Sequence, residues 1–452
     1  MRSLIITIAS VFMCAVLFCM PVYSSPKDLS PPDVKELYKQ IQELKKRINQ
    51  LEEVIKKKEA KEEELRKDIE EVKEAKKTIE EIKERIGNIS IHGGVVSYYQ
   101  AASSGENSAL VSTTNPEGHF SNPDGAGYVA DIEISWKPIE NGKFYMRIHA
   151  GEGDGADDIL ENGGALFADL NTINDDNPDD SEIDVLEAYY TQTLFDGMLS
   201  VSFGKTEPFA FVDDNEFAND ENSQFVGKPF VNNPMFDSED EYGPILALSF
   251  NPKFFKPLKN VTFTALIQSS SYPRNSVGKQ KDEWSNFFRR PLIAGQITYS
   301  PTIRGMSGNY RIYGWVQTYK HDKIANKTGT DEGWGVGLSC DQYLTERIGV
   351  FGRFGYQNDE VYEAPIFYSA GAYIKGLIPI RKDDELGIGF AGLKANHAFD
   401  EHHTEYHGEA YYKFVFSDNF ALTLDLQYVE NPLGNNDNND IWAGMVRGEF
   451  NF

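Results

Sequence analysis

Histidines gather in one short stretch, "HAFDEHHTEYH", which holds four of the eight histidines of the chain: His397, His402, His403 and His407. His403 and His407 are four residues apart, a spacing that on a helix suits a zinc ion. The composition of this stretch instead predicts a loop that enters a strand. There the two side chains would lie about 13 Å apart, at ~3.3 Å per residue. We therefore favour a solvated loop cluster over a metal site.

Two acidic stretches are the next candidates for chemistry, "GEGDGADD" at 151–158 and "NDDNPDD" at 174–180. Their carboxylates are the oxygen ligands that calcium prefers, and they could also bridge lipopolysaccharide through divalent cations. Neither stretch follows the spacing of an EF-hand loop. We expect no cofactor and no dedicated metal site; divalent cations bound by these loops are the alternative.

Catalytic motifs are missing from the sequence. It contains no GxSxG, no Walker A motif and no HExxH. Pairs of Asp and Glu occur along the whole chain, so no single pair indicates an acid–base site. The sequence therefore predicts a protein that is not an enzyme.

The net charge is strongly negative and unevenly distributed. The chain has 70 acidic and 44 basic residues, a formal net charge of −26. Residues 27–90 hold about 17 of each sign, so nearly all of the net charge falls in residues 91–452. Nucleic-acid binding requires basic patches, and we exclude it as a function.

The amino-terminal residues predict export. Arg2 is followed by an apolar run from Leu4 to Cys19 and by "VYS", a cleavage site that ends at Ser24. This pattern predicts a signal peptide that covers residues 1–24 and is cleaved after Ser24. The alternative is an uncleaved membrane anchor, but the apolar run is short for spanning a bilayer. Cleavage leaves Cys340 as the one cysteine, so no internal disulfide forms. No later apolar run is long enough for a transmembrane helix.

A heptad pattern occupies the next segment, residues 25–88. Residues 33–86 lack Gly and Pro, and apolar residues recur at alternating spacings of three and four from Val34 to Ile55 and again from Leu65 to Ile86. The pattern predicts a coiled-coil stalk of roughly 80 Å at ~1.5 Å per residue. A single solvated helix laced with ion pairs is the alternative.

Residues 89–452 have a different character, rich in aromatic and β-branched residues that alternate with polar ones. The pattern predicts sixteen strands. They are expected near 90–101, 126–137, 142–150, 185–194, 197–206, 242–251, 258–269, 290–301, 308–319, 332–341, 346–356, 366–374, 385–394, 404–416, 419–430 and 440–452. Short connections such as "PIENG", "FDG" and "SDN" alternate with long ones at 102–125, 151–184, 207–241 and 270–289.

Such alternation is typical of an even-stranded antiparallel transmembrane β-barrel in an outer membrane, with short turns on the periplasmic side. The alternation within strands agrees. In "LTLDLQY", Leu422, Leu424 and Leu426 share one face while Asp425 and Gln427 share the other. The polar faces are too charged for a packed core, so we expect lipid outside and water inside. The last strand, ending at Phe452, resembles the closing strand of such barrels.

Three segments carry a family resemblance: "GKTEPFAFVDDNEFANDENSQFVGKPFVNNP" at 204–234, "MRIHAGEGDG" at 146–155 and "LTLDLQYVENPLGNN" at 422–436. They occur in the order found in the carbohydrate-selective porins, the OprB-like family, which this chain resembles over most of residues 91–452. The amino-terminal coiled coil is an addition to the usual pattern. The resemblance implies passive diffusion of small hydrophilic solutes, with a preference for carbohydrates. In porins the third external loop, here 207–241, commonly folds inward and narrows the pore.

A sugar path needs hydrogen-bonding groups beside exposed aromatic rings, and it must bind weakly enough to release the solute. Each candidate below could instead be a wall residue or loop cap without a role in selectivity. In the third loop the candidates are Glu207, Asp213, Asp214, Asn215, Asn219 and Asp220. Inside the barrel they are Arg147, Arg311, Tyr313, Trp315, Arg353, Glu409, Tyr411, Lys413, Asp425, Gln427 and Arg447.

Three functions remain open from the sequence. The first is a sugar-permeable outer-membrane porin. Its expected partners are lipid, lipopolysaccharide, small carbohydrates and two further copies in a homotrimer. The second is a general or cation-favouring porin, since the lumen and loops are acidic. In the third the barrel anchors a structural tether, and the periplasmic coiled coil contacts the cell wall.

Overall fold

The computed structural model describes residues 87–103, 122–156, 166–174, 183–238, 242–269, 287–288, 290–324 and 328–452, with scattered residues between 38 and 77. The chain divides into two compact units, residues 1–85 and 86–452. The described residues of the first unit are helical. The predicted signal peptide lies outside the described residues, as does most of the predicted coiled coil, whose pairing stays a prediction. Among the described helices, none is both long and apolar enough to span a membrane.

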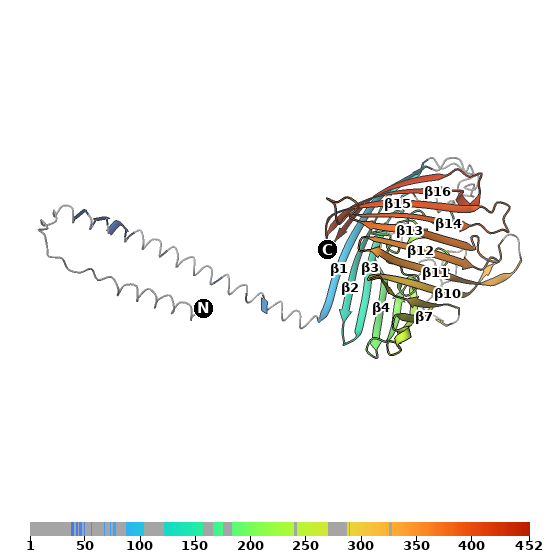
Figure 1. Ribbon diagram of the computed structural model, residues 1–452, viewed down its shortest axis with the longest axis horizontal. Helices are drawn as coiled ribbons and strands as arrows, with labels where there is room; N and C mark the ends of the chain where they lie inside the picture. Colours follow the sequence, from blue (N-terminus) through green and yellow to red (C-terminus); the bar gives the residue numbers. More distant parts are fainter. Residues whose placement is uncertain are drawn as a thin grey trace. The chain divides into compact units, whose positions relative to one another are not determined.

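The second unit is one antiparallel sheet closed into a barrel, with strands that follow one another in chain order (Figure 1). The first strand pairs with the second on one side and with the last on the other, which closes the ring. The strands are β1 (Asn88–Ser103), β2 (Asp124–Lys137), β3 (Gly142–Glu152), β4 (Asp184–Leu194), β5 (Leu199–Thr206), β6 (Gly243–Phe250), β7 (Val261–Ser269), β8 (Pro291–Tyr299), β9 (Thr302–Ile303), β10 (Met306–Asp322), β11 (Thr330–Thr345), β12 (Ile348–Gln357), β13 (Ile366–Lys375), β14 (Glu385–Lys394), β15 (Thr404–Ser417), β16 (Phe420–Glu430) and β17 (Ile441–Asn451). The two-residue β9 pairs only with the start of β10, so sixteen strands form the wall.

The sixteen-stranded antiparallel barrel predicted from the sequence is confirmed, strand by strand and in order. The boundaries differ by a few residues. The strand expected from residue 258 begins at Val261, because Lys256–Leu258 forms a 3-10 turn with a proline at its centre. Proline has no N–H to give to a strand ladder, so pairing cannot start there.

Short turns lie at one end of the barrel and long connections at the other. The turns at 138–141 and 195–198 close hairpins with left-handed residues, including Asn141 at φ 60° and Gly197 at φ 80°. These conformations match the twist of the strands that they join. The long connections are 104–123, 153–183, 207–242 and 270–290. The first residue of β1 pairs with the last of β2, so the chain enters the barrel at the short-turn end.

The two faces of the wall differ as the alternation predicts. On β16, Leu424 and Leu426 point outward and are about half exposed, whereas Asp425 and Gln427 point inward and are buried. On β10, likewise, the outward Ile312 is exposed and the inward Trp315 is buried. An apolar outer surface and a polar inner one is the arrangement that a lipid-embedded barrel requires.

Candidate solute path inside the barrel

We call the connection between β5 and β6, residues 207–242, the third loop; its described residues 207–238 lie inside the barrel. Its Phe225 and Phe230 are buried and pack in one apolar cluster with Tyr313 and Tyr411 of the wall. The cluster includes residues of β10, β12, β13 and β15. The inward folding implied by the family resemblance is therefore present, and the loop covers one side of the inner wall.

Arg353 on β12 is the most enclosed anchor of the third loop, with a side chain that is 0% exposed. Its Nε lies 3.2 Å from Oδ1 of Asp213, and its Nη1 donates to the Phe230 carbonyl at 2.8 Å. Asp213 also accepts the Asn233 N–H at 2.7 Å. Burial raises the pKa of the Asp213 carboxyl, although Arg353 and the Asn233 N–H act in the opposite direction. A buried pair of this kind fixes the loop in one place.

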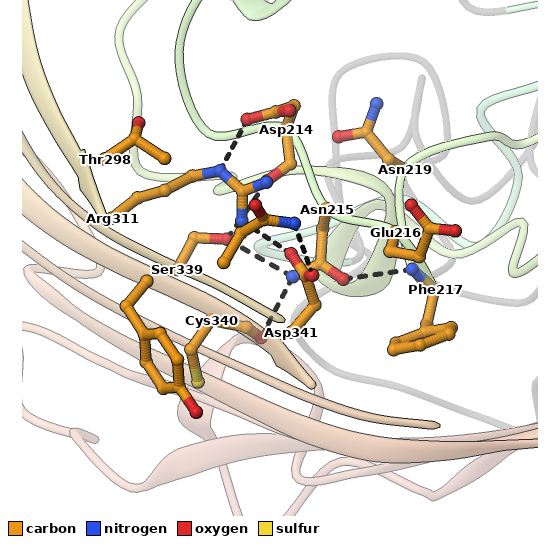
Figure 2. A network of polar contacts seen from close by, with 12 residues as sticks. Asp214, Asn215, Glu216, Phe217, Asn219, Thr298, Arg311, Ser339, Cys340 and Asp341 are labelled. Carbon is orange, nitrogen blue, oxygen red and sulfur yellow. Dashed lines mark hydrogen bonds and ion pairs between the residues drawn. The ribbon is translucent and has the colours of Figure 1, made fainter. Parts of the chain in front are cut away.

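Arg311 on β10 is a second anchor, shown in Figure 2 between two carboxylates. Its Nε lies 2.5 Å from Oδ1 of Asp214 in the loop, and its Nη1 donates to Oδ2 of Asp341 on β11 at 2.6 Å. Beside it, the Asn215 amide donates to Oγ of Ser339 and to the backbone carbonyl of β11 at Cys340, both at 3.2 Å. The loop is thus attached to two neighbouring strands.

Arg447 and Glu409 hold the far part of the loop. Arg447 on β17 donates to the carbonyls of Glu221 and Gln224, at 2.5 and 2.8 Å. Glu409 on β15 accepts the backbone N–H groups of Val226 and Gly227, at 2.7 and 3.0 Å. Glu409 thereby satisfies two buried backbone N–H groups, and Arg447 two partly buried carbonyls.

The three inward aromatic residues predicted from the sequence are covered by the loop. The Tyr313 hydroxyl accepts a hydrogen bond from the Asn233 amide at 3.0 Å. The ring of Trp315 lies 4.8 Å from that of Phe236, centroid to centroid. Tyr411 meets Phe225 edge-on at 5.0 Å. All three are at most 2% exposed, so they pack against the loop and do not face open lumen.

A second loop connects β3 to β4, and its described residues 166–174 also fold inward, which the sequence reasoning missed. The Thr172 N–H donates to the Val226 carbonyl at 3.0 Å, joining the two loops. Gln427 on β16 donates to the Leu170 carbonyl at 2.6 Å, and Phe167 N–H donates to Glu405. Leu170 and Ile173 are buried. The apolar residues of "GALFADLNTIN", set between acidic stretches, were the available indication of this packing.

The inner wall of β2, β3 and β4 is partly open: Val129 and His149 are buried, whereas other inward side chains keep some exposure. Arg147 on β3 keeps 15% of its side chain exposed; its Nε lies 2.9 Å from Oδ1 of Asp131 and its Nη1 3.9 Å from Oε1 of Glu187. Next to it the rings of Tyr145 and Tyr189 lie 5.4 Å apart. The spacing of two between Tyr145 and Arg147 places both on the inner face, which the sequence could have indicated. Glu133, also inward, was likewise missed.

Phe211 extends this aromatic row from the third loop, its ring centroid 6.2 Å from that of Tyr189. The row therefore has three members, Tyr145, Tyr189 and Phe211. We call it the aromatic row. It lies beside the Arg147 guanidinium and the carboxylates of Asp131 and Glu187. Rings next to hydrogen-bonding groups form the surface that a sugar contacts with its apolar faces and its hydroxyls.

Two cavities open on the inner side at the short-turn end. One of about 320 Å³ lies between β1, β2, β17 and the tip of the third loop, and its carboxylates are Asp131, Glu133, Asp220 and Glu449. The other, of about 340 Å³, contains Lys413 and shares Glu449. Both are large enough to admit small solutes, and the first has a strong excess of acidic groups.

The remaining predicted residues have local roles. Glu207 precedes the 3-10 turn Pro208–Ala210. The Asn219 N–H donates to the Gln224 side chain, and Asp220 accepts the Asn222 N–H, which shapes the loop tip. Asp425 is buried opposite Tyr411 on the neighbouring strand. Lys413 forms an ion pair with Glu449.

The histidine cluster does not converge. His407 is buried on β15 with its Nε2 2.7 Å from Oε1 of Glu405, while His402 and His403 are exposed. Within the described ranges, no group of three or more His, Cys, Asp and Glu side chains could hold a metal ion.

Comparison with known proteins gives a family match and a fold match. Residues 139–452 match the model of the family described as carbohydrate-selective porin, OprB family. The chain is similar to an uncharacterized protein of Aquifex aeolicus (strain VF5), 26% identical over 268 residues, which are 58% of this chain and 71% of that protein. The fold is similar to the high-pH structure of OprB from Pseudomonas putida, with a TM-score of 0.65, 15% identity, and coverage of 80% of this chain and 94% of that one.

Proposed function

We propose a route for sugars through this protein, which belongs to the carbohydrate-selective porin, OprB family, and is therefore an outer-membrane channel for small solutes and not an enzyme. In this proposal sugars cross along the partly open wall of β2, β3 and β4. The path passes between the aromatic row and the tip of the third loop, with Arg147, Asp131 and Glu133 as its polar groups. Arg353, Arg311, Arg447 and Glu409 act as anchors of the loop and touch no solute.

The contrast in exposure between the two sides of the lumen carries this proposal. Arg353, on the covered side, is fully enclosed, whereas Arg147 keeps access to open space. A solute that moves passively must meet side chains that retain partial exposure. Weak, repeated contacts with tyrosine rings and one cation suit a neutral sugar that has to bind and leave.

Single-channel conductance of the purified full-length protein, titrated with mono- and disaccharides, tests the path. We expect a steady conductance that sugars reduce in a concentration-dependent manner. Replacing Tyr145 and Tyr189 together by alanine should weaken the block about 2- to 10-fold, the worth of an aromatic contact. Tyr411→Phe is the matched control, since Tyr411 is buried under the third loop. An unchanged block in the Tyr145/Tyr189 variant would remove the path from this wall.

A cation-favouring porin is the second candidate. Asp131, Glu133, Asp220 and Glu449 line one cavity, and such a group of carboxylates attracts cations. Reversal potential in a salt gradient separates the two functions. Strong cation selectivity without sugar block would replace sugar passage by this second function.

Assembly and anchoring belong to the same proposal. We propose that residues 1–24 direct export and are removed, that residues 25–88 form a periplasmic coiled-coil stalk, and that barrel and stalk assemble as a homotrimer in contact with lipopolysaccharide. A stalk of that length would reach the cell wall and contact it. Passage along the wall of β2–β4 requires no cofactor.

A further inference from the structure

The turn between β6 and β7, "NPKFFKPLKN" at residues 251–260, has a charge unlike that of the chain as a whole. It carries Lys253, Lys256 and Lys259 and no acidic residue, in a chain of net charge −26. The next turn along the same end, residues 300–305, adds Arg304 and again no acidic residue. We call these four side chains the basic rim patch.

The four cationic side chains of the basic rim patch are exposed and can contact a ligand. The three lysines and Arg304 are exposed. In the part of the chain that the structure describes, none of the four side chains forms an ion pair or a hydrogen bond. Most basic residues inside the barrel are neutralised by carboxylates, as Arg147 and Lys413 are. The patch therefore presents uncompensated positive charge to its surroundings.

Backbone hydrogen bonds hold the two turns in a fixed shape. Asn251 N–H donates to the Met198 carbonyl at 2.8 Å, and Phe255 N–H donates to the Pro252 carbonyl at 2.9 Å. The Ser300 N–H donates to the Asn260 carbonyl at 2.9 Å, which ties the second turn to the first. A surface that is already ordered loses little entropy when it binds.

Aromatic residues link the patch to the lipid-facing belt. Phe254 and Phe255 of the turn are 75% and 52% exposed. Directly below the turn, Phe250 and Phe263 are paired across β6 and β7, and both point outward with exposed rings. The apolar belt therefore ends at the foot of the turn. Rings at this height lie among acyl chains and headgroups, and lysines beyond them extend toward the headgroup layer.

We propose that the basic rim patch binds the phosphate headgroups of anionic phospholipids in the leaflet that borders the short-turn end of the barrel. This rests on the proposed function only in that the barrel must be embedded in a membrane. Charge complementarity identifies the partner, because clustered lysines beside interfacial aromatic rings attract anionic lipid. Other short turns mix their charges or are acidic, with Glu140, Asp196, Glu346 and Asp418, so the site is confined to one sector of the rim.

The test uses full-length protein reconstituted in phosphatidylcholine vesicles that contain a trace of spin-labelled phosphatidylglycerol or spin-labelled phosphatidylcholine. We expect the wild type to retain the anionic label preferentially. In K253Q/K256Q/K259Q this preference should fall by at least about fivefold, the factor that one lysine near an anionic surface contributes. High salt should reduce the wild-type preference, because the patch is solvent-exposed.

The matched control, K137Q/R347Q/K382Q, removes the same charge from exposed residues in or directly beside three other turns of the same end. It should keep the wild-type preference. An equal loss in both variants, or no anionic preference in the wild type, would overturn the proposal. If the triple variant fails to fold, K256Q alone should give a partial fall, and no fall would also overturn it. Conductance in the same vesicles reports channel function separately, since no patch residue lies on the proposed path.

Discussion

Arg353 and Asp213 form a buried ion pair between the wall and the third loop, and their removal has a defined pH signature. Replacing Arg353 by methionine should cost about 3 kcal/mol or more, because it leaves a buried carboxylate without its partner. Burial already raises the pKa of Asp213. An acid with a raised folded-state pKa favours the folded state at low pH, below its unfolded pKa, and loses that advantage as the pH rises through the folded pKa.

Thermal unfolding of R353M against the wild type, measured from pH 4 to pH 8, checks this sign. The free energy of unfolding of R353M is expected to be lower than that of the wild type, and this deficit should grow as the pH rises. In the double variant D213N/R353M the titrating carboxyl is gone, so the deficit should be flat with pH. A deficit that is equally flat in R353M would show that Asp213 does not titrate in this range.

Asp384, in the turn between β13 and β14, gives the opposite pH dependence. Burial by itself raises the pKa of Asp384, but hydrogen bonds from Arg381, the Val415 N–H and the Tyr412 hydroxyl outweigh it and hold the pKa below its usual value. A lowered pKa stabilises the folded state above the unfolded pKa, and this stability is lost as the pH falls through the folded pKa.

Asp384→Asn should therefore lower stability by about 1.5–3 kcal/mol at pH 7, the range for hydrogen bonds to a charged group. The difference from the wild type should shrink below about pH 4, the usual pKa of an aspartate. Thermal unfolding at several pH values measures it. Asp383→Asn, at an exposed neighbour, should have little effect, and an effect as large as that of Asp384→Asn would contradict the assignment.

At the scale of elements, the third loop depends on strands that leave room for its rings. A Cβ on Gly349 of β12 would lie 2.1 Å from the ring of Phe217 in the loop. Gly349→Ala should displace that part of the loop at a cost of about 1–3 kcal/mol, the range for overpacking. Since the wall itself is unchanged, we expect a folded barrel with an altered single-channel conductance.

Gly408→Ala on β15 is the matched control, because a Cβ there meets nothing within 4 Å. Its conductance should equal that of the wild type. If Gly349→Ala also conducts as the wild type does, the position of Phe217 has no influence on the open path.

The strands could be predicted from the sequence because a period of two and turn residues are local properties. The ends were misplaced where local geometry interrupts pairing, as at Lys256–Leu258 before β7. The alternation of apolar and polar residues also predicted which face of each strand points inward. The sequence did not predict which inward residues the loops cover. Arg353, for example, contacts Asp213 only because of the path of the third loop, and spacing along the chain does not reveal that path. The sequence therefore singled out the anchors without revealing their role, and Tyr145 was missed although its spacing of two from Arg147 places it on the inner face.

At the scale of the whole molecule, the barrel is self-contained. All of its strands pair with one another within residues 88–451, and the compact unit begins at residue 86. Deleting residues 27–85 should therefore leave single-channel conductance and sugar block unchanged. If the stalk holds three copies together, the same deletion should reduce the trimer fraction on a native gel. A deletion variant that inserts but does not conduct would show that the channel needs the stalk.

The seam between β1 and β17 has a consequence for how the chain is made. Val95 faces Phe450 and Ala102 faces Ala443 across it, so contacts that complete the ring join residues more than three hundred positions apart. Every other pairing of the wall joins neighbours in the chain and can form early. The first strand must keep one unpaired edge until the last strand is synthesised and delivered, and such an edge invites pairing with foreign strands. The topology therefore leaves that edge open to wrong pairing until β17 closes the ring.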